Sequence, residues 1–309
     1  MVTSKKNNSI SCARTISMIM IVSCHILQYS NNELAWWLNV GVYSFIAISG
    51  FLYGEKEISD STTFLAKRIK KILIPYWLYL PFAFTLIWIV TGSLNIKQSI
   101  GMLLLTNTVN GLDHLWYIAY IMICYMITPY LCDFKKHVNK KTDIQKIMIW
   151  FVLCTILQTI CFIGFPGFKM SVINTYIISF ALSGIVFQKK FVVICLALVL
   201  NVLKIVYENQ HILFPGFHYF SDYCHMALGI AILTICLVVF RNVKYNSFLS
   251  FSDKQSYSIY ICHHIFILGP LSLMQLTQDI PLNITVILII TLASAILLTK
   301  FSNWIINQL

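Results

Sequence analysis

Residues 11–25 read SCARTISMIMIVSCH, an apolar run that contains one arginine, Arg14, and one histidine, His25. In an α-helix, eleven residues leave two side chains about 20° apart around the axis and about 16 Å apart along it. That separation is about half the thickness of a bilayer core. Ionisable side chains inside a membrane segment are costly and usually face a cavity or a partner. We therefore expect Arg14 and His25 to line one ligand site, with the anionic end of the ligand at the arginine.

The composition indicates an integral membrane protein. Hydrophobic residues make up 58% of the 309-residue chain and charged residues 11%, whereas soluble domains carry about 25% charged residues. The fold class we predict is all-α, a polytopic transmembrane helical bundle, in one domain over residues 1–309. The first apolar run carries Arg14 and His25, so we expect no cleaved signal peptide.

The distribution of the basic residues argues against a nucleic-acid partner, and the spacing of the cysteines argues against a bound metal. The net charge of +11 is spread along the chain, which fits loops on one side of a membrane better than a nucleic-acid site. The ten cysteines form no CxxC pair and no Cys/His spacing typical of metal ligands. We expect them to be small buried hydrophobic residues, and we expect no metal site.

Apolar stretches long enough to cross a bilayer can be placed ten times. Their predicted bounds are 11–30, 36–54, 72–91, 114–132, 145–164, 172–188, 190–207, 221–240, 256–275 and 281–300. The boundary at 188–190 is a short basic turn, so nine or eleven spans are alternatives. With ten spans, 19 of the 22 Lys and Arg residues fall on one side. The positive-inside rule then places both termini in the cytoplasm.

Five motifs occur in a characteristic order. Arg14 and His25 are separated by ten residues, and residues 45–52 read FIAISGFL. Residues 67–77 read KRIKKILIPYW, residues 114–118 read HLWYI before Pro129, and residues 256–264 read SYSIYICHH. In this order the chain resembles the acyltransferase-3 family of integral-membrane acyltransferases, over about residues 10–300.

The resemblance implies ten core helices in the cytoplasmic (inner) membrane. It also implies transfer of an acyl group from cytoplasmic acetyl-CoA to a hydroxyl of a surface glycan such as O-antigen or capsule, or of a lipid-linked precursor. Two positions depart from the usual family pattern. Ala13 and Thr15 flank the arginine where many members have an acidic or amide residue and a glycine. The basic pair before the third span is Arg68 and Lys71 instead of two arginines, which weakens bidentate phosphate binding at Lys71.

His25 is the predicted general base, because a hydroxyl must lose its proton as it attacks a thioester and imidazole titrates near neutrality. The alternative is a buried histidine that hydrogen-bonds a neighbouring helix. No carboxylate in the first two spans would orient His25, so a carboxylate on another helix or a backbone carbonyl is expected to do so. Arg14 would hold the phosphate or pantetheine region of the donor, and the alternative is an arginine that reaches lipid headgroups.

Further donor-binding residues are predicted at the cytoplasmic side. Arg68 and Lys71 lie one helical turn apart, although such loops are basic for topology alone. In the ninth span, Tyr257, Tyr260 and His264 recur at i, i+3 and i+7, with His264 about two turns from the cytoplasmic end and His263 pointing elsewhere. A polar stripe that bridges helices would explain the same pattern. Ser49 and Gly50 complete the predicted donor set, with helix packing as the ordinary alternative.

His114, Trp116 and Tyr117 start the fourth span on the outer side and are the predicted acceptor-binding residues, since sugar rings stack on aromatic faces. An aromatic belt at the membrane interface would equally explain Trp116 and Tyr117. Asp113 is next to His114, but adjacent residues do not share a helix face.

Two other classes of function are weighed. In a proton-coupled transporter of an anionic small molecule, Arg14 would bind the substrate and His25 would relay protons. The internal repeats and helices broken by Gly or Pro midway that often mark transporters are not visible. A membrane scaffold gives no reason for Arg14 and His25 to align. Transfer of another acyl group instead of acetyl, and formation of a covalent acyl-enzyme, both stay open.

Overall fold

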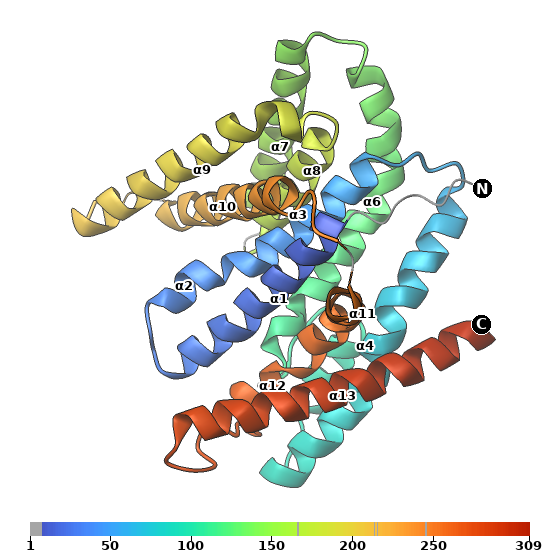
Figure 1. Ribbon diagram of the computed structural model, residues 1–309, viewed down its shortest axis with the longest axis vertical. Coiled ribbons are helices and arrows are strands. Elements are labelled where there is room, and N and C mark those ends of the chain that lie inside the picture. The colour runs from blue at the N-terminus through green and yellow to red at the C-terminus, as the bar shows by residue number, and fades with distance from the viewer. Residues whose placement is uncertain (1–7, 166, 213, 215, 245) are drawn as a thin grey trace. The chain divides into compact units, whose positions relative to one another are not determined.

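The structure is a computed structural model that describes residues 8–165, 167–212, 214, 216–244 and 246–309. Over these residues it is all-helical (Figure 1), as the composition predicted. The elements are α1 (Asn8–Tyr29), α2 (Leu34–Leu38), α3 (Val40–Gly54), α4 (Ser61–Thr91), α5 (Ile96–Leu103), η1 (Asp113–Leu115), α6 (Trp116–Val138), α7 (Asp143–Gly164), α8 (Met170–Leu182), α9 (Val186–Asn209), α10 (Phe217–Val239), α11 (Ser247–Cys262), α12 (His264–Ile267) and α13 (Ile280–Gln308).

Eight of the ten predicted spans correspond to helices that are long and apolar enough to cross a membrane. Among the described residues these are Asn8–Tyr29, Leu34–Gly54, Ser61–Thr91, Asp113–Val138, Asp143–Gly164, Gln188–Asn209, Phe217–Val239 and Ile280–Gln308. The sixth predicted span corresponds to α8, whose 13 residues extend about 20 Å, less than the thickness of a bilayer core. The ninth corresponds to α11 and α12, and the first half of α11 is polar.

The chain divides into two compact units, which we describe separately. Unit 1 consists of residues 1–17, 40–61 and 123–246. Unit 2 consists of residues 18–39, 62–122 and 247–309. The long helices α1 and α6 each contribute residues to both units.

Helices α3, α8 and α10 pack against one another in unit 1, and glycines allow their close approach. A Cβ atom on Gly50 of α3 would overlap the carbonyl oxygen of Tyr176 in α8. A Cβ on Gly229 of α10 would lie 2.6 Å from the Cβ of Tyr43 in α3. Apolar side chains close the core around these contacts, namely Ile10, Ala13, Ala47, Ile48, Phe51, Ile230, Leu233, Cys236 and Leu237.

A lysine ties two helix ends together in unit 1. The Nζ atom of Lys135 donates to the carbonyl oxygens of Gly54, at 2.8 Å, and Phe180, at 3.2 Å, and to Oγ of Ser183 at 2.7 Å. These carbonyls belong to the C-terminal turns of α3 and α8, which lack helical donors. A cation at a helix C-terminus is also favourable for the helix dipole.

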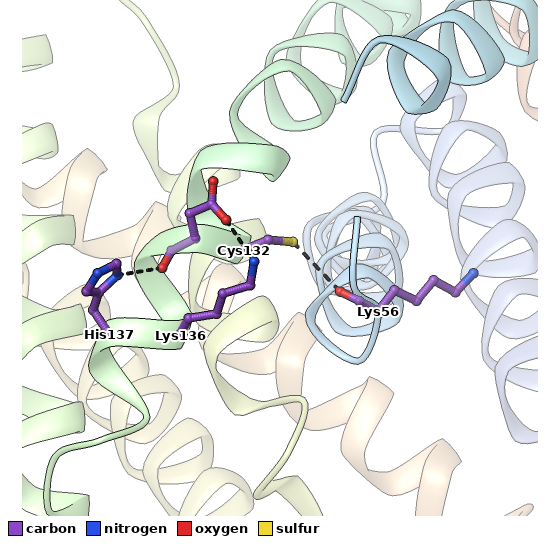
Figure 2. Close-up of polar contacts among 5 residues, drawn as sticks. Lys56, Cys132, Lys136 and His137 are labelled. Carbon is purple, nitrogen blue, oxygen red and sulfur yellow. Dashed lines mark hydrogen bonds and ion pairs between the residues drawn. The ribbon is translucent and has the colours of Figure 1, made fainter. Parts of the chain in front are cut away.

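Figure 2 shows the neighbouring polar contacts at the end of α6. Lys136 pairs with Asp133 at 3.0 Å, and His137 Nδ1 donates to the carbonyl oxygen of Asp133 at 2.9 Å. Cys132 Sγ lies 3.8 Å from the carbonyl oxygen of Lys56, just beyond α3. The basic segment predicted for the cytoplasmic side therefore continues α6 as an ordered helix end.

Unit 2 contains the long helix α4 and the C-terminal helix α13. α4 starts at Ser61, so the basic run before the third span is helical. Asn283 near the start of α13 is fully buried. Its Nδ2 donates to the carbonyl oxygens of Met274 and Thr277, and its Oδ1 accepts from the backbone nitrogen and hydroxyl of Thr277. These bonds hold the loop that joins α12 to α13.

Candidate active site

Unit 2 brings four of the chain's eight histidines together: His25, His114, His263 and His264, which we call the histidine cluster. The ring centroid of His25 lies 4.5 Å from that of His264, 5.2 Å from His263 and 6.3 Å from His114. His114 stacks on His264 at 4.5 Å and lies 5.0 Å from His263. The four rings come from α1, η1 and the junction of α11 and α12, segments that are far apart in the sequence.

His25 lies one turn before the end of α1, about 6 Å from that end along the axis. Its Nδ1 is 2.6 Å from Oε1 of Gln28 on the next turn of the same helix. An amide oxygen can only accept, so Nδ1 carries the proton and Nε2 keeps its lone pair. Gln28 is thus the orienting partner of His25, where the sequence led us to expect a carboxylate on another helix or a backbone carbonyl.

The prediction that His263 points elsewhere was wrong. His263 keeps a helical backbone, with φ −69° and ψ −40°, and its nitrogen donates to the carbonyl oxygen of Ile259. The rings of His263 and His264 lie 5.2 Å and 4.5 Å from that of His25, so the two adjacent side chains flank one site. The predicted depth of His264 also needs correction, because α11 begins at Ser247 and not near residue 256. His264 is seventeen residues from that start, about 26 Å along a helix instead of two turns.

Backbone carbonyls fix the orientation of His114 and His263. Nε2 of His114 lies 3.0 Å from the carbonyl oxygen of Tyr260 and 3.2 Å from that of Ile261. Nδ1 of His263 lies 2.8 Å from the carbonyl oxygen of Tyr260 and 3.1 Å from that of Ile259. Carbonyl oxygens only accept, so each of these ring nitrogens is the protonated one. The last turn of α11 therefore holds both rings.

Two glycines place the loop before η1 against the loop after α12. Gly111 and Gly269 have φ angles of +86° and +99°, respectively. A Cβ on Gly269 would lie 2.5 Å from the Cα of Gly111, so the two backbones touch. The carbonyl oxygen of Gly111 accepts a hydrogen bond from Nδ1 of His264 at 2.9 Å. The glycine contact thus supports the position of His264.

Aromatic side chains surround the cluster on the α6 and α11 sides. The Tyr260 hydroxyl donates to the carbonyl oxygen of His114. Tyr117 is 5% exposed, and its ring lies 5.1 Å from that of Tyr260. Trp116 packs on Tyr120 at 5.3 Å, edge to face, and is more exposed than Tyr117. Of the predicted acceptor-binding residues, the structure therefore places His114 inside the cluster and Tyr117 in the core beside it.

The predicted donor-binding residues are divided between the two units. Arg14, Ser49 and Gly50 belong to unit 1, and Gly50 is explained by packing against α8. Ser49 Oγ lies 3.5 Å from the carbonyl oxygen of Phe45, one turn before it.

In unit 2 the other predicted donor-binding residues lie on α4, α11 and α12, and the one on α12, His264, belongs to the histidine cluster. The Arg68 guanidinium lies over the ring of Phe64 at 5.8 Å, while Lys71 is exposed. Tyr257 donates its hydroxyl proton to the carbonyl oxygen of Ile72 at 2.8 Å, which ties α11 to α4. Tyr257 therefore has a clear structural contact of its own.

Unit 1 contains a hollow of about 190 Å³ at the start of α8 and α10. It is lined by apolar atoms and by polar side chains that include Gln158, Lys169, Ser171, His218 and Asp222. None of the residues that the sequence singled out for catalysis or binding lines it. Within the described part of the chain, no three His, Cys, Asp or Glu side chains are arranged to hold a metal ion.

Comparison with known proteins identifies the family of this chain. Neither the curated proteins nor the solved structures include a match to this chain. The family model described as an acyltransferase domain matches residues 7–300, nearly the whole length. The chain therefore belongs to the acyltransferase-3 family.

Proposed function

We propose that this membrane acyltransferase moves an acetyl group from cytoplasmic acetyl-CoA to a hydroxyl of a cell-surface glycan or its lipid-linked precursor. The observation that carries the proposal is the environment of His25. Its ring is held by Gln28 through Nδ1 at 2.6 Å, and three further imidazoles surround it. A neutral imidazole with one oriented lone pair is suited to general-base catalysis.

In this reaction Nε2 of His25 removes the proton of the acceptor hydroxyl. The hydroxyl oxygen forms a bond to the thioester carbonyl carbon, and the carbon–sulfur bond breaks. The products are an ester of the glycan and the thiol of the donor. Positioned general bases typically contribute about 10²–10⁴-fold to a rate.

The donor would be held from the cytoplasmic side. Arg14 lies on the same continuous helix as His25, about 16 Å from it along the axis. One helix can therefore hold both the anionic and the reacting end of an extended donor. Arg68 and Lys71 on α4 supply further positive charge, and the guanidinium stays ionised in a partly dry cavity. Ser49, Gly50 and Tyr257 are weaker candidates, because each already has a structural contact.

The acceptor would reach the histidine cluster from the outer side. Ten crossings would place 19 of the 22 basic residues, together with both termini, in the cytoplasm. His25, near the C-terminal end of α1, and His114, in η1 just before α6, then both belong to the outer half of the membrane. Trp116 is the aromatic side chain best placed to stack on a sugar ring. Membership of an acyltransferase family leaves the transport alternative without an observation in its favour.

The test uses purified protein in liposomes with radiolabelled acetyl-CoA and a glycan acceptor. We expect His25→Ala to lose acetyl transfer by at least about 100-fold and Arg14→Ala to raise the KM for acetyl-CoA. His137→Ala is the matched control, because His137 is exposed and outside the cluster, and it should behave like the native chain. A folded native sample that neither binds nor consumes acetyl-CoA would overturn the donor assignment.

A further inference from the structure

The four rings of the histidine cluster share one feature: each commits one nitrogen to an acceptor and leaves the other with a lone pair. The committed nitrogens are Nδ1 of His25, His263 and His264 and Nε2 of His114. The remaining nitrogens are Nε2 of His25, His263 and His264 and Nδ1 of His114. Four cations at these separations would repel one another in a medium of low dielectric constant, so the resting cluster is an assembly of neutral imidazoles with four basic nitrogens.

Two of these basic nitrogens have no hydrogen-bond partner among the residues that the structure describes. Nδ1 of His114 and Nε2 of His263 are buried and unpaired, in side chains that are 5% and 0% exposed, respectively. Buried polar atoms are almost always paired in folded proteins, so unpaired ones call for an explanation. A lone pair that receives a proton or a hydrogen-bond donor during the reaction cycle provides that explanation here.

The groups around the cluster offer little competing charge. The Asp113 carboxylate interacts with His264, but its oxygens accept bonds from Thr108 Oγ1 at 3.0 Å and from the Gly111 nitrogen at 3.3 Å. The titratable side chains whose rings adjoin the cluster are weak acids: Tyr260 lies 5.2 Å from His114, and Tyr117 lies 5.1 Å from Tyr260. The charged residues Arg14 of α1, Arg68 of α4 and Asp253 of α11 lie on the same helices as cluster residues or their neighbours, two or more turns away along the chain.

We propose that His25, His114, His263 and His264 hold a single proton between them during acyl transfer. The proposal rests on the proposed function for the origin of that proton, which His25 takes from the acceptor hydroxyl. The O–H bond of the acceptor breaks and an N–H bond forms on the cluster. After the carbon–sulfur bond breaks, the cluster returns the same proton to the departing thiolate, so the protein ends the cycle unchanged.

The short distances between the four rings explain why the cluster holds only one proton. The partial negative charge of the neighbouring lone pairs stabilises a proton on His25, because their rings lie 4.5–6.3 Å from its ring in a medium of low dielectric constant. Once one ring is protonated, a second cation within a few ångströms is repelled in a medium of low dielectric constant. Such interacting groups titrate as a unit and not as individual residues.

Two substitutions each remove one basic nitrogen and keep the N–H group that anchors the ring. His263→Asn keeps an amide N–H near the position of Nδ1, which can still donate to Tyr260, but removes the lone pair of Nε2. His114→Gln keeps an N–H near the position of Nε2 and removes the lone pair of Nδ1. His137→Asn is the control, because that histidine is exposed at the end of α6.

We expect both cluster variants to move the acid limb of the pH–rate profile to lower pH by about one unit, the scale on which coupled groups interact. The control should leave the limb in place. A purely structural role for His114 and His263 would lower kcat without moving the limb. An unmoved limb in both folded variants would therefore overturn the proposal.

A second measurement does not depend on turnover. Nitrogen-15 spectra of labelled histidines in proteoliposomes should show protonated Nε2 in His114 and protonated Nδ1 in the other three. Acidification should then add one proton across the four rings, spread over several signals. Four independent full titrations would refute proton sharing even if acetyl transfer is observed. Shared titration in a protein that transfers no acetyl group would instead refute the proposed function alone.

Discussion

Replacing Gly269 by alanine should separate the two loops that support the histidine cluster. Gly269 has a φ of +99°, and an L-residue in the left-handed region costs about 1–2 kcal/mol. The new Cβ would lie 2.5 Å from the Cα of Gly111, a backbone atom that cannot rotate away. Overpacking of this kind costs about 1–3 kcal/mol. We therefore expect Gly269→Ala to destabilise unit 2 by about 2–5 kcal/mol, a large part of the stability of a typical domain.

Gly92→Ala isolates the backbone strain from the contact. Gly92 has a φ of +68° and no atom within 4 Å of the position of a Cβ, so only about 1–2 kcal/mol is expected there. Gly111→Ala should fall between the two, because its Cβ would meet Pro270 Cδ at 3.0 Å. This separation is 0.5 Å longer than the 2.5 Å contact at Gly269, so the neighbouring atom has less far to move.

The assay is thermal unfolding of the three variants in one detergent, followed by acetyl transfer at a temperature where all are folded. Gly269→Ala should show the lowest Tm and the largest loss of activity, because moving Gly111 breaks its hydrogen bond with Nδ1 of His264. A Gly269→Ala protein that is as stable and as active as Gly92→Ala would refute the argument that backbone contact between the loops supports the cluster.

Three further changes test other parts of the structure. Gln28→Ala should lower kcat with little change in the KM for acetyl-CoA, because His25 loses the acceptor that fixes its tautomer. Gln28→Glu keeps an acceptor oxygen and should retain more activity. Equal activities of the two variants would contradict this role of Gln28. Gly50→Ala should unfold unit 1 at a lower temperature than Gly164→Ala does, since only the Cβ at residue 50 would meet backbone atoms; equal Tm values would show that the α3–α8 contact is not tight. Asn283→Leu should lower the free energy of unfolding by at least about 1–3 kcal/mol, because it leaves several buried backbone groups without partners. Thermal unfolding measures this change, and a Tm equal to that of the native chain would refute the prediction.

Much of the architecture was predictable because hydrophobicity and helical periodicity are local properties of the chain. Few charges and long apolar runs required membrane-crossing helices, and eight of the ten predicted spans have such helices. The two others differ at their ends. α8 has 13 residues and ends at Leu182, two residues before Gly184, and α11 begins nine residues earlier than the span predicted at 256–275 because a partly polar segment forms its first turns.

The sequence by itself also determined the family through five ordered motifs, and it singled out His25 because a histidine in an apolar helix is costly. Only the tertiary structure placed His114 and His263 beside it, whereas Gln28, three residues later on the same helix, follows from helical periodicity. Periodicity assigns His263 and His264 to different faces, yet both rings lie within 5.2 Å of the ring of His25. The close approach of Gly111 and Gly269 joins segments about 160 residues apart. Periodicity reports which residues share one helix face, whereas contacts between distant segments depend on where helices end and how closely their backbones approach.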